Sequence, residues 1–256
     1  MKNVILSKLS EIEIRENVKI LYAVESGSRA WGFESPDSDY DCRFIYVRRP
    51  EDYLRLDTLR YVIEWQLDDT LDINGWDIVK TLRLSHKSNP TVFEWRASPI
   101  VYRRDPLWEG ISSLISEYFD KRMLATHYIS MARRNIEAYL KSDLVKMKKY
   151  LYVLRPLLCC RYVLEKEAPP PMLMKTLTDE YLFGEVKETL NELLLKKSVT
   201  SELGECAHIP ALDSFIEGEL SRLNEQVATL KRSLPQPWDR MNEAFISLLS
   251  QAWGTR

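Results

Sequence analysis

The chain has 256 residues, of which 45% are hydrophobic and 29% charged, and its formal net charge is −2. This composition is typical of a globular protein with its own core, and the small net charge argues against a surface that coats nucleic acid throughout. The four cysteines lack metal-binding spacing, no apolar run is long enough to span a membrane, and the N-terminus is unlike a signal peptide. We therefore expect a cytoplasmic protein without a membrane partner.

The first hundred residues alternate between helical and extended patterns. In chain order, the expected elements are a helix at residues 4–15, a strand at 19–24, a short helix at 29–33, a strand at 40–47, a strand at 61–67, a short strand at 71–73, a helix at 76–84, a helix at 91–95 and a strand at 98–102. The fold class that this order predicts is α+β.

Two acidic residues, Asp39 and Asp41, open the strand expected at 40–47 and follow the pair Gly27-Ser28 by about a dozen residues. Because side chains two residues apart in a strand point to the same face, both carboxylates are expected to reach one spot. Mg²⁺ binds proteins through one or two carboxylates together with substrate phosphates. A Gly-Ser turn beside them offers backbone N–H groups and a hydroxyl to phosphate oxygens. The stretch therefore predicts neighbouring metal and phosphate sites.

After residue 105 the extended pattern stops and helical spacing takes over. Helices are expected along residues 124–139, 144–158, 185–197, 210–231 and 238–253, with Pro156 kinking the second of them. We therefore predict two domains, one from residue 1 to 105 and a helical one from 106 to 256.

The ordered combination of a Gly-Ser pair, the motif D-x-D and a later apolar-acid-apolar triplet resembles the DNA polymerase beta-like nucleotidyltransferase superfamily. Residues 72–102 and 148–163 resemble, more closely, a family of predicted nucleotidyltransferases that includes RNA-ligase-associated members. The resemblance implies a small, mixed-sheet domain like the polymerase beta palm, followed by a helical domain. It also implies transfer of a nucleoside monophosphate from an NTP to an acceptor hydroxyl, with two Mg²⁺ ions, or Mn²⁺ in their place, and release of pyrophosphate.

This resemblance assigns roles to the acidic residues. Asp39 and Asp41 would bind the metal ions, and Asp72, between two apolar residues, would be the third metal ligand and support the attacking hydroxyl. Glu64 fits the same local template as Asp72. Asp77 is a further alternative, although a carboxylate at that position also suits the N-terminus of the next helix.

The expected nucleotide-binding residues come from both parts of the chain. Gly27 and Ser28 would hold the triphosphate, and Arg29 either reaches a phosphate or lies on the surface. Lys80 is expected either at the nucleotide or on a solvated helix face. The last two candidates lie on a basic helix in the C-terminal part: Lys148 and Tyr152.

The acceptor hydroxyl separates the functional hypotheses. We favour an RNA 3′ end, because of the basic helix and the ligase-associated relatives. A hydroxyl of a protein or of a small molecule is the enzymatic alternative. The other class of hypothesis is a module that binds nucleotides or RNA without catalysis.

Overall fold

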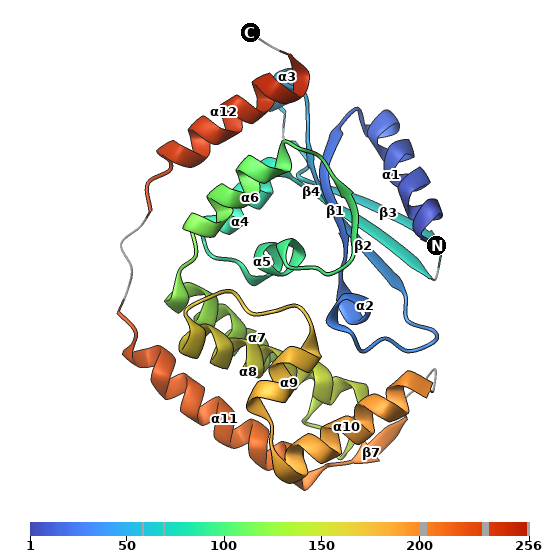
Figure 1. Ribbon diagram of the computed structural model, residues 1–256, viewed down its shortest axis with the longest axis vertical. Coiled ribbons are helices and arrows are strands. Elements are labelled where there is room, and N and C mark those ends of the chain that lie inside the picture. The colour runs from blue at the N-terminus through green and yellow to red at the C-terminus, as the bar shows by residue number, and fades with distance from the viewer. Residues whose placement is uncertain (58, 69, 200–203, 232–235, 255–256) are drawn as a thin grey trace.

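The protein is described here by a computed structural model that covers residues 1–57, 59–68, 70–199, 204–231 and 236–254 (Figure 1). Its main sheet contains β1 (Lys19–Glu25), β2 (Tyr40–Val47), β3 (Val62–Asp68), β4 (Leu71–Asp77) and β5 (Val101–Arg104). The strand order is β3-β4-β2-β1-β5. β2 and β4 are parallel and the other neighbours are antiparallel. The predicted mixed sheet is therefore confirmed.

One face of the sheet is covered by α1 (Lys2–Glu16) (Figure 1). The apolar residues of this helix recur at helical spacing and are fully buried, as the sequence predicts: Ile5, Leu9 and Ile12. They pack with Cys42, Phe44 and other apolar side chains of that sheet face. Asn17, in the left-handed conformation, ends the helix and turns the chain into β1.

The opposite face carries the larger core, which continues into the helical part of the chain. Three helices lie against this side of the sheet: α4 (Ile78–Ser85), α5 (Pro90–Arg96) and α6 (Trp108–Glu117) (Figure 1). Tyr22 of β1 stacks on Trp108 of α6, with ring centroids 4.9 Å apart. The sheet and the helices that follow it therefore share buried surface.

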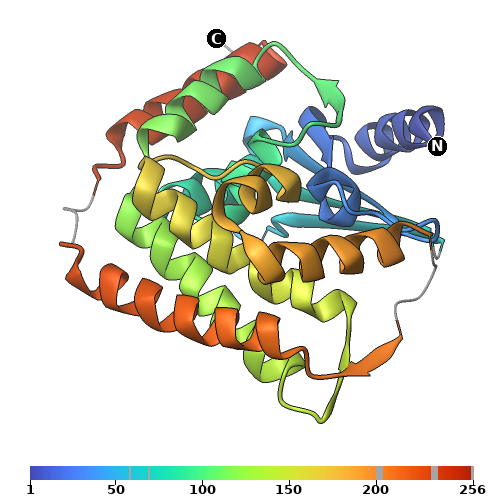
Figure 2. The ribbon, with the colours of Figure 1, turned by 60° about the horizontal axis from the view of Figure 1, so that its bottom comes forward.

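The C-terminal part of the chain is a helical bundle. Its helices are α7 (Lys121–Tyr139), α8 (Lys148–Lys166), α9 (Met174–Tyr181), α10 (Gly184–Val199) and α11 (Pro210–Thr229). Helices α7 and α8 lie side by side and α11 packs across both (Figure 2). A small antiparallel pair, β6 (Leu144–Lys146) with β7 (Glu205–Ala207), borders the bundle. The helical region that was predicted to follow the sheet is thus confirmed.

The last helix, α12 (Asp239–Trp253), returns to the sheet-bearing part (Figure 1). Phe245 packs edge-on against Tyr53 of the short helix α3 (Pro50–Tyr53), with ring centroids 5.1 Å apart. The indole N–H of Trp253 donates to the carbonyl of Arg48 at 2.8 Å. No helix in the described part of the chain has both the length and the apolar character needed to cross a membrane.

Several expected elements differ from those observed. β4 continues to Asp77, so the helix expected from residue 76 begins at Ile78. The strand expected at 98–102 lies at 101–104, and the helix expected to start at residue 144 begins at Lys148, after the strand β6. Helices α6 and α9 and strand β7 were not anticipated, because short elements carry few pattern repeats.

Candidate active site

The candidate site lies where β2 and β4 begin and β1 ends. In the parallel pair β2/β4, Asp41 stands directly beside Asp72. Residues in register on neighbouring strands point to the same face, so the two carboxylates lie next to each other. Asp39 precedes β2 by one residue. The sheet therefore brings together Asp41 and Asp72, which are 31 positions apart in the sequence. Asp39 is two residues from Asp41 along the chain.

Gly27 closes one side of this carboxylate group. It begins the short helix α2 (Gly27–Trp31) with a φ of +60°, a conformation that glycine adopts without strain. A Cβ atom at this position would lie 2.0 Å from Oδ2 of Asp41, so no side chain fits. The glycine of the Gly-Ser pair is thus required both by the turn and by the close approach of a site carboxylate.

Glu25, which the sequence analysis did not select, anchors the same corner. Its side chain is fully buried at the end of β1. Oε1 accepts a hydrogen bond from the backbone N–H of Asp41 at 2.6 Å, and Oε2 accepts one from the hydroxyl of Tyr102. Burial raises the pKa of this carboxyl, while both hydrogen bonds act in the opposite direction. Glu25 therefore fixes the backbone from which the Asp41 side chain projects.

The loop between α2 and β2 is held by hydroxyls and by Arg29. Ser28 donates through its Oγ to Oγ of Ser38 at 3.1 Å. Arg29 donates to the carbonyls of Ser38 and Asp39, at 2.6 and 3.1 Å, and its guanidinium lies 3.8 Å from the ring centroid of Tyr40. The contacts of Arg29 in this structure are thus with the loop that carries Asp39.

A cleft of about 460 Å³ opens in front of these residues. Gly27, Ser28, Asp37, Asp39 and Asp41 line it from the sheet side. The opposite wall comes from the bundle and contains Lys148 and Tyr152 of α8 and Lys197 of α10. The structure thus brings six of the predicted site residues around one cavity: 27, 28, 39, 41, 148 and 152. The lining of this cavity contains both carboxylates and ammonium groups.

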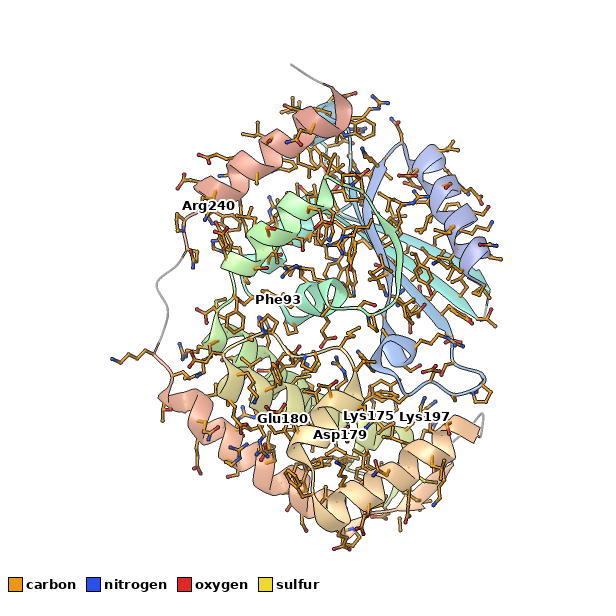
Figure 3. All side chains as sticks on the ribbon, in the orientation of Figure 1. Phe93, Lys175, Asp179, Glu180, Lys197 and Arg240 are labelled. Carbon is orange, nitrogen blue, oxygen red and sulfur yellow. The ribbon has the colours of Figure 1, made fainter. Side chains whose placement is uncertain are left out.

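Lys197 is the second residue that the sequence analysis missed. It lies near the end of α10 that approaches the sheet-bearing part (Figure 3). Its ammonium donates to the carbonyl of Phe33 at 2.6 Å, although the side chain is almost fully buried. Burial lowers the pKa of this lysine, and Asp37 opposes that shift. A lysine 164 positions away from its partner gives no local sequence signal.

Aromatic rings line the inner end of the cleft. Trp31 and Tyr152 meet edge to face, with ring centroids 5.8 Å apart. The guanidinium of Arg155 lies 4.5 Å from the Trp31 ring centroid and forms an ion pair with Glu94 at 2.7 Å. This buried ion pair links α8 to α5, and its guanidinium packs against the ring of Trp31.

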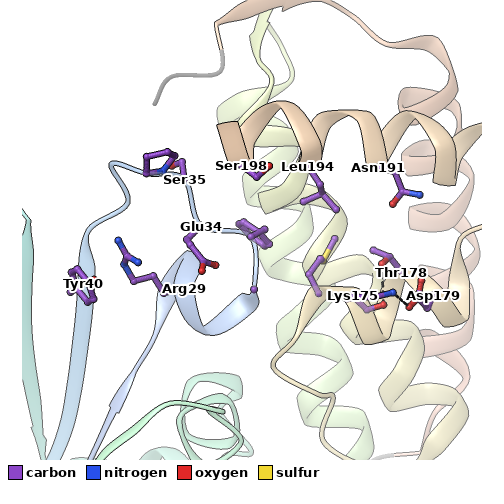
Figure 4. Close-up of a pocket in the computed structure, with 14 residues that line it drawn as sticks. Arg29, Glu34, Ser35, Tyr40, Lys175, Thr178, Asp179, Asn191, Leu194 and Ser198 are labelled. Carbon is purple, nitrogen blue, oxygen red and sulfur yellow. Dashed lines mark hydrogen bonds and ion pairs between the residues drawn. The ribbon is translucent and has the colours of Figure 1, made fainter. Parts of the chain in front are cut away.

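A second cavity, of about 750 Å³, adjoins the cleft on the far side of the loop after α2 (Figure 4). Arg29, Glu34 and Tyr40 line it from one side, and α9 and α10 contribute the other. Lys175 and Asp179 of α9 form an ion pair at its edge. Its charged lining residues balance one another, in contrast to the carboxylate-rich cleft.

Asp72 does not itself line the cleft but lies beside Asp41, Arg29 lines the second cavity, and three further sequence candidates lie apart from both. Asp77 is fully buried at the other end of β4 and caps α4 by accepting the N–H of Val79 at 2.8 Å. Glu64 is exposed and pairs with Arg60 at 2.6 Å. The ammonium of Lys80 lies 4.3 Å from the ring centroid of Trp76. Of the three alternatives for the third carboxylate, Asp72 is therefore the one beside Asp41.

Arg43 is the third residue that was missed, and it lies between the two carboxylates. Its Nη2 donates to Oδ1 of Asp41 at 2.8 Å and to Oδ2 of Asp72 at 2.7 Å. Burial raises the pKa of Asp41; Arg43 opposes that shift, whereas Asp72 and Asp39 add to it. Two adjacent carboxylates that bind one cation between them form a donor set that suits Mg²⁺.

Within the described ranges, no three His, Cys, Asp or Glu side chains already converge as a metal-binding group. Asp41 and Asp72 are held by the guanidinium, and Asp39 lines the cleft beside them. The residues present fit a divalent cation by their chemistry and by the cationic group they already share.

The chain is similar to known proteins over nearly its whole length. A family model described as "RNA repair pathway DNA polymerase beta family" matches residues 1–247. The chain is 43% identical over 255 residues to the uncharacterized protein YcgL of Bacillus subtilis (strain 168), across 99% of this chain and 98% of that protein. A solved nucleotidyltransferase-like protein from Exiguobacterium sibiricum 255-15 aligns with 98% of this chain and 80% of its own, at 13% identity and a TM-score of 0.32.

Proposed function

The chain belongs to the RNA repair pathway DNA polymerase beta family, and on that premise we propose that it is a metal-dependent nucleotidyltransferase. In the proposed reaction, an acceptor hydroxyl attacks the α-phosphorus of an NTP. The bond from that phosphorus to the oxygen of the β-phosphate breaks, pyrophosphate leaves, and the nucleoside monophosphate remains on the acceptor.

One observation carries this proposal: Asp41 lies between Asp72 in register on one side and Gly27 in contact on the other, at the mouth of a cleft with two lysines. The missing side chain of Gly27 lets its backbone pack directly against the Asp41 carboxylate. Because Gly27, Ser28 and Asp41 also line one cleft, a phosphate in that cleft would lie beside both the turn and the carboxylate.

The residues then divide into three groups by role. Asp39, Asp41 and Asp72 would hold Mg²⁺, or Mn²⁺ in its place, which when bound stabilises the charge on the attacking and leaving oxygens. Asp72 is half exposed and accepts the proton of the acceptor hydroxyl. The remaining group binds the nucleotide: backbone N–H of Gly27, the hydroxyl of Ser28, the ammonium groups of Lys148 and Lys197, and the rings of Trp31 and Tyr152.

We further propose that the acceptor is an RNA 3′ end. The rim of the cleft supports this, because the ammonium of Lys149 lies 3.9 Å from the ring centroid of Tyr139 and 5.2 Å from that of Tyr152. Lysines that neutralise phosphates next to aromatic rings that stack on bases are typical of surfaces that bind single-stranded nucleic acid. The family description, with its reference to RNA repair, supports the same acceptor.

The direct test is to incubate the protein with each labelled NTP, Mg²⁺ and RNA with a free 3′ hydroxyl. Label should enter the RNA and pyrophosphate should appear in equal amount. The double variant Asp39→Asn/Asp41→Asn should lose at least about a thousandfold in rate. The matched control, Asp52→Asn/Asp57→Asn, removes two acidic groups from the same part of the chain and should keep full activity. Equal rates for the two double variants would refute the metal assignment.

A further inference from the structure

Arg43, in the otherwise largely apolar strand β2, contacts both Asp41 and Asp72. It follows Asp41 by two residues in β2, so both side chains are on the same face of the sheet. Besides its bonds to the two carboxylates, Nη1 donates to the carbonyl of Asp72 at 3.1 Å and to that of Cys42 at 3.2 Å. The side chain is 18% exposed. This is a partly buried guanidinium with four acceptors, two of them carboxylate oxygens.

The electrostatic reason for this arrangement is direct. Asp41 and Asp72 are adjacent in register, and without a cation between them the two negative charges would repel each other in a partly desolvated corner. A guanidinium is always charged and its planar array of donors matches two carboxylates well. The position that suits this guanidinium is, for the same reason, the position that suits a divalent ion.

The two cations exclude each other. Nη2 lies within hydrogen-bond distance of one oxygen on each carboxylate, and those oxygens cannot also approach a metal ion without bringing two positive charges together. When a divalent ion takes these oxygens, Arg43 loses its partners. Phosphate oxygens of a nucleotide in the adjoining cleft, which Asp41 lines, would be the next strong acceptors for this guanidinium.

We propose, on the basis of the proposed function, that Arg43 is an internal counter-cation that competes with the metal ion for Asp41 and Asp72 and is transferred to the substrate phosphates when the metal and nucleotide bind. Arg43 therefore weakens the binding of metal alone and contributes to the reaction once the nucleotide is present. The site consequently favours the metal–nucleotide pair over the bare ion.

The test measures the binding of Mn²⁺ alone, by electron paramagnetic resonance, to the full chain and its variants. Arg43→Gln should bind Mn²⁺ about tenfold more tightly than the wild type, because a charge-assisted competitor has been removed. Arg43→Lys keeps a positive charge and should remain close to the wild type. Arg60→Gln removes a positive charge from the segment just before β3, where Arg60 pairs with Glu64, and controls for the change in net charge.

Turnover provides the second measurement. Arg43→Gln should need less metal for half-maximal activity, yet its kcat should fall about tenfold, because the phosphates lose a partner. Unchanged or weaker Mn²⁺ binding by Arg43→Gln would overturn the proposal. The double variant Asp41→Asn/Asp72→Asn separates this failure from that of the proposed function: if it binds Mn²⁺ as the wild type does, the metal site itself is wrongly assigned.

Discussion

The acidic residues at the two ends of β4 differ in burial and in hydrogen-bond partners. Where the strand begins, Asp72 and its neighbour Asp41 share the guanidinium of Arg43 beside an open cleft. Where it finishes, Asp77 is fully buried, one of its oxygens accepts the N–H of Val79 at 2.8 Å, and the other accepts the hydroxyl of Tyr53 at 3.0 Å. The difference teaches how we expect a structural carboxylate to be told from a binding one: the first is buried with fixed hydrogen-bond donors, and the proposed binding carboxylates lie beside a cavity and share a cation that a ligand could replace.

Among the tests of this comparison, the largest effect is expected from Gly27→Ala, which displaces the Asp41 carboxylate beside the cleft. The new Cβ would lie 2.0 Å from Oδ2 of Asp41, so the carboxylate must retreat by roughly 1 Å, and such a displacement costs about a hundredfold in rate. The positive φ adds a strain of about 1 kcal/mol for alanine. Steady-state turnover and thermal unfolding of the same preparation measure the two effects.

Gly110→Ala is the matched control for that substitution. Gly110 lies inside α6, and a Cβ there would meet nothing within 4 Å. Alanine in a helix interior is more stable than glycine by about 1 kcal/mol, so this variant should unfold at a higher temperature with unchanged turnover. If Gly27→Ala kept full activity, the contact between the Gly-Ser turn and Asp41 would not matter for the reaction.

The sequence predicts the Gly-Ser turn and the D-x-D carboxylates better than it predicts the other residues of the site. Gly27, Ser28, Asp39 and Asp41 are close in sequence, so turn chemistry and strand alternation are sufficient to place them. Glu25, Arg43 and Lys197 act through partners that only the fold supplies: a backbone N–H, a parallel strand and a distant loop carbonyl. Such partners leave no periodicity in the chain.

Strand β4 shows the same limit for the fold. Asn74 and Gly75 are weak strand formers, but pairing with β2 and β3 on both sides keeps them extended. A Cβ at residue 75 would lie 2.2 Å from the ring of Phe44, so the glycine is required by packing. Tertiary context therefore overrides local preference, and the capping residue of α4 is Asp77.

Buried Asp77, at the end of β4, should make the stability of the protein depend on pH, an effect of intermediate size. Burial raises the pKa of Asp77 from 3.8 to about 6, so between these values the folded protein binds more protons than the unfolded chain. The contribution of this group to stability is therefore lost as pH rises through that window, by up to roughly 3 kcal/mol. In Asp77→Asn this loss is absent, so its free energy of unfolding relative to the wild type should increase from pH 4 to pH 7.

Denaturant titrations at several pH values measure this difference, and Asp57→Asn provides the contrast. Asp57 is exposed, and its hydrogen bonds to Arg55 lower its pKa, so its contribution to stability grows as pH rises. The stability of Asp57→Asn relative to the wild type should thus fall with pH, opposite to the trend for Asp77→Asn. Parallel trends for both variants would show that Asp77 is solvated in the folded protein.

The smallest expected effects come from removing one tyrosine hydroxyl at each end of the sheet. Tyr53→Phe takes a donor from buried Asp77 and should lower the free energy of unfolding by about 1–2 kcal/mol, more at pH 8 than at pH 5, with unchanged kcat. Tyr102→Phe takes a donor from Glu25, whose other oxygen holds the backbone N–H of Asp41. This second variant should lower kcat several-fold, because Glu25 can then turn away from the backbone that positions the Asp41 side chain. If Tyr53→Phe lowered kcat as much as Tyr102→Phe does, both ends of the sheet would contribute to the reaction, and burial with fixed donors would no longer distinguish a structural carboxylate from a binding one.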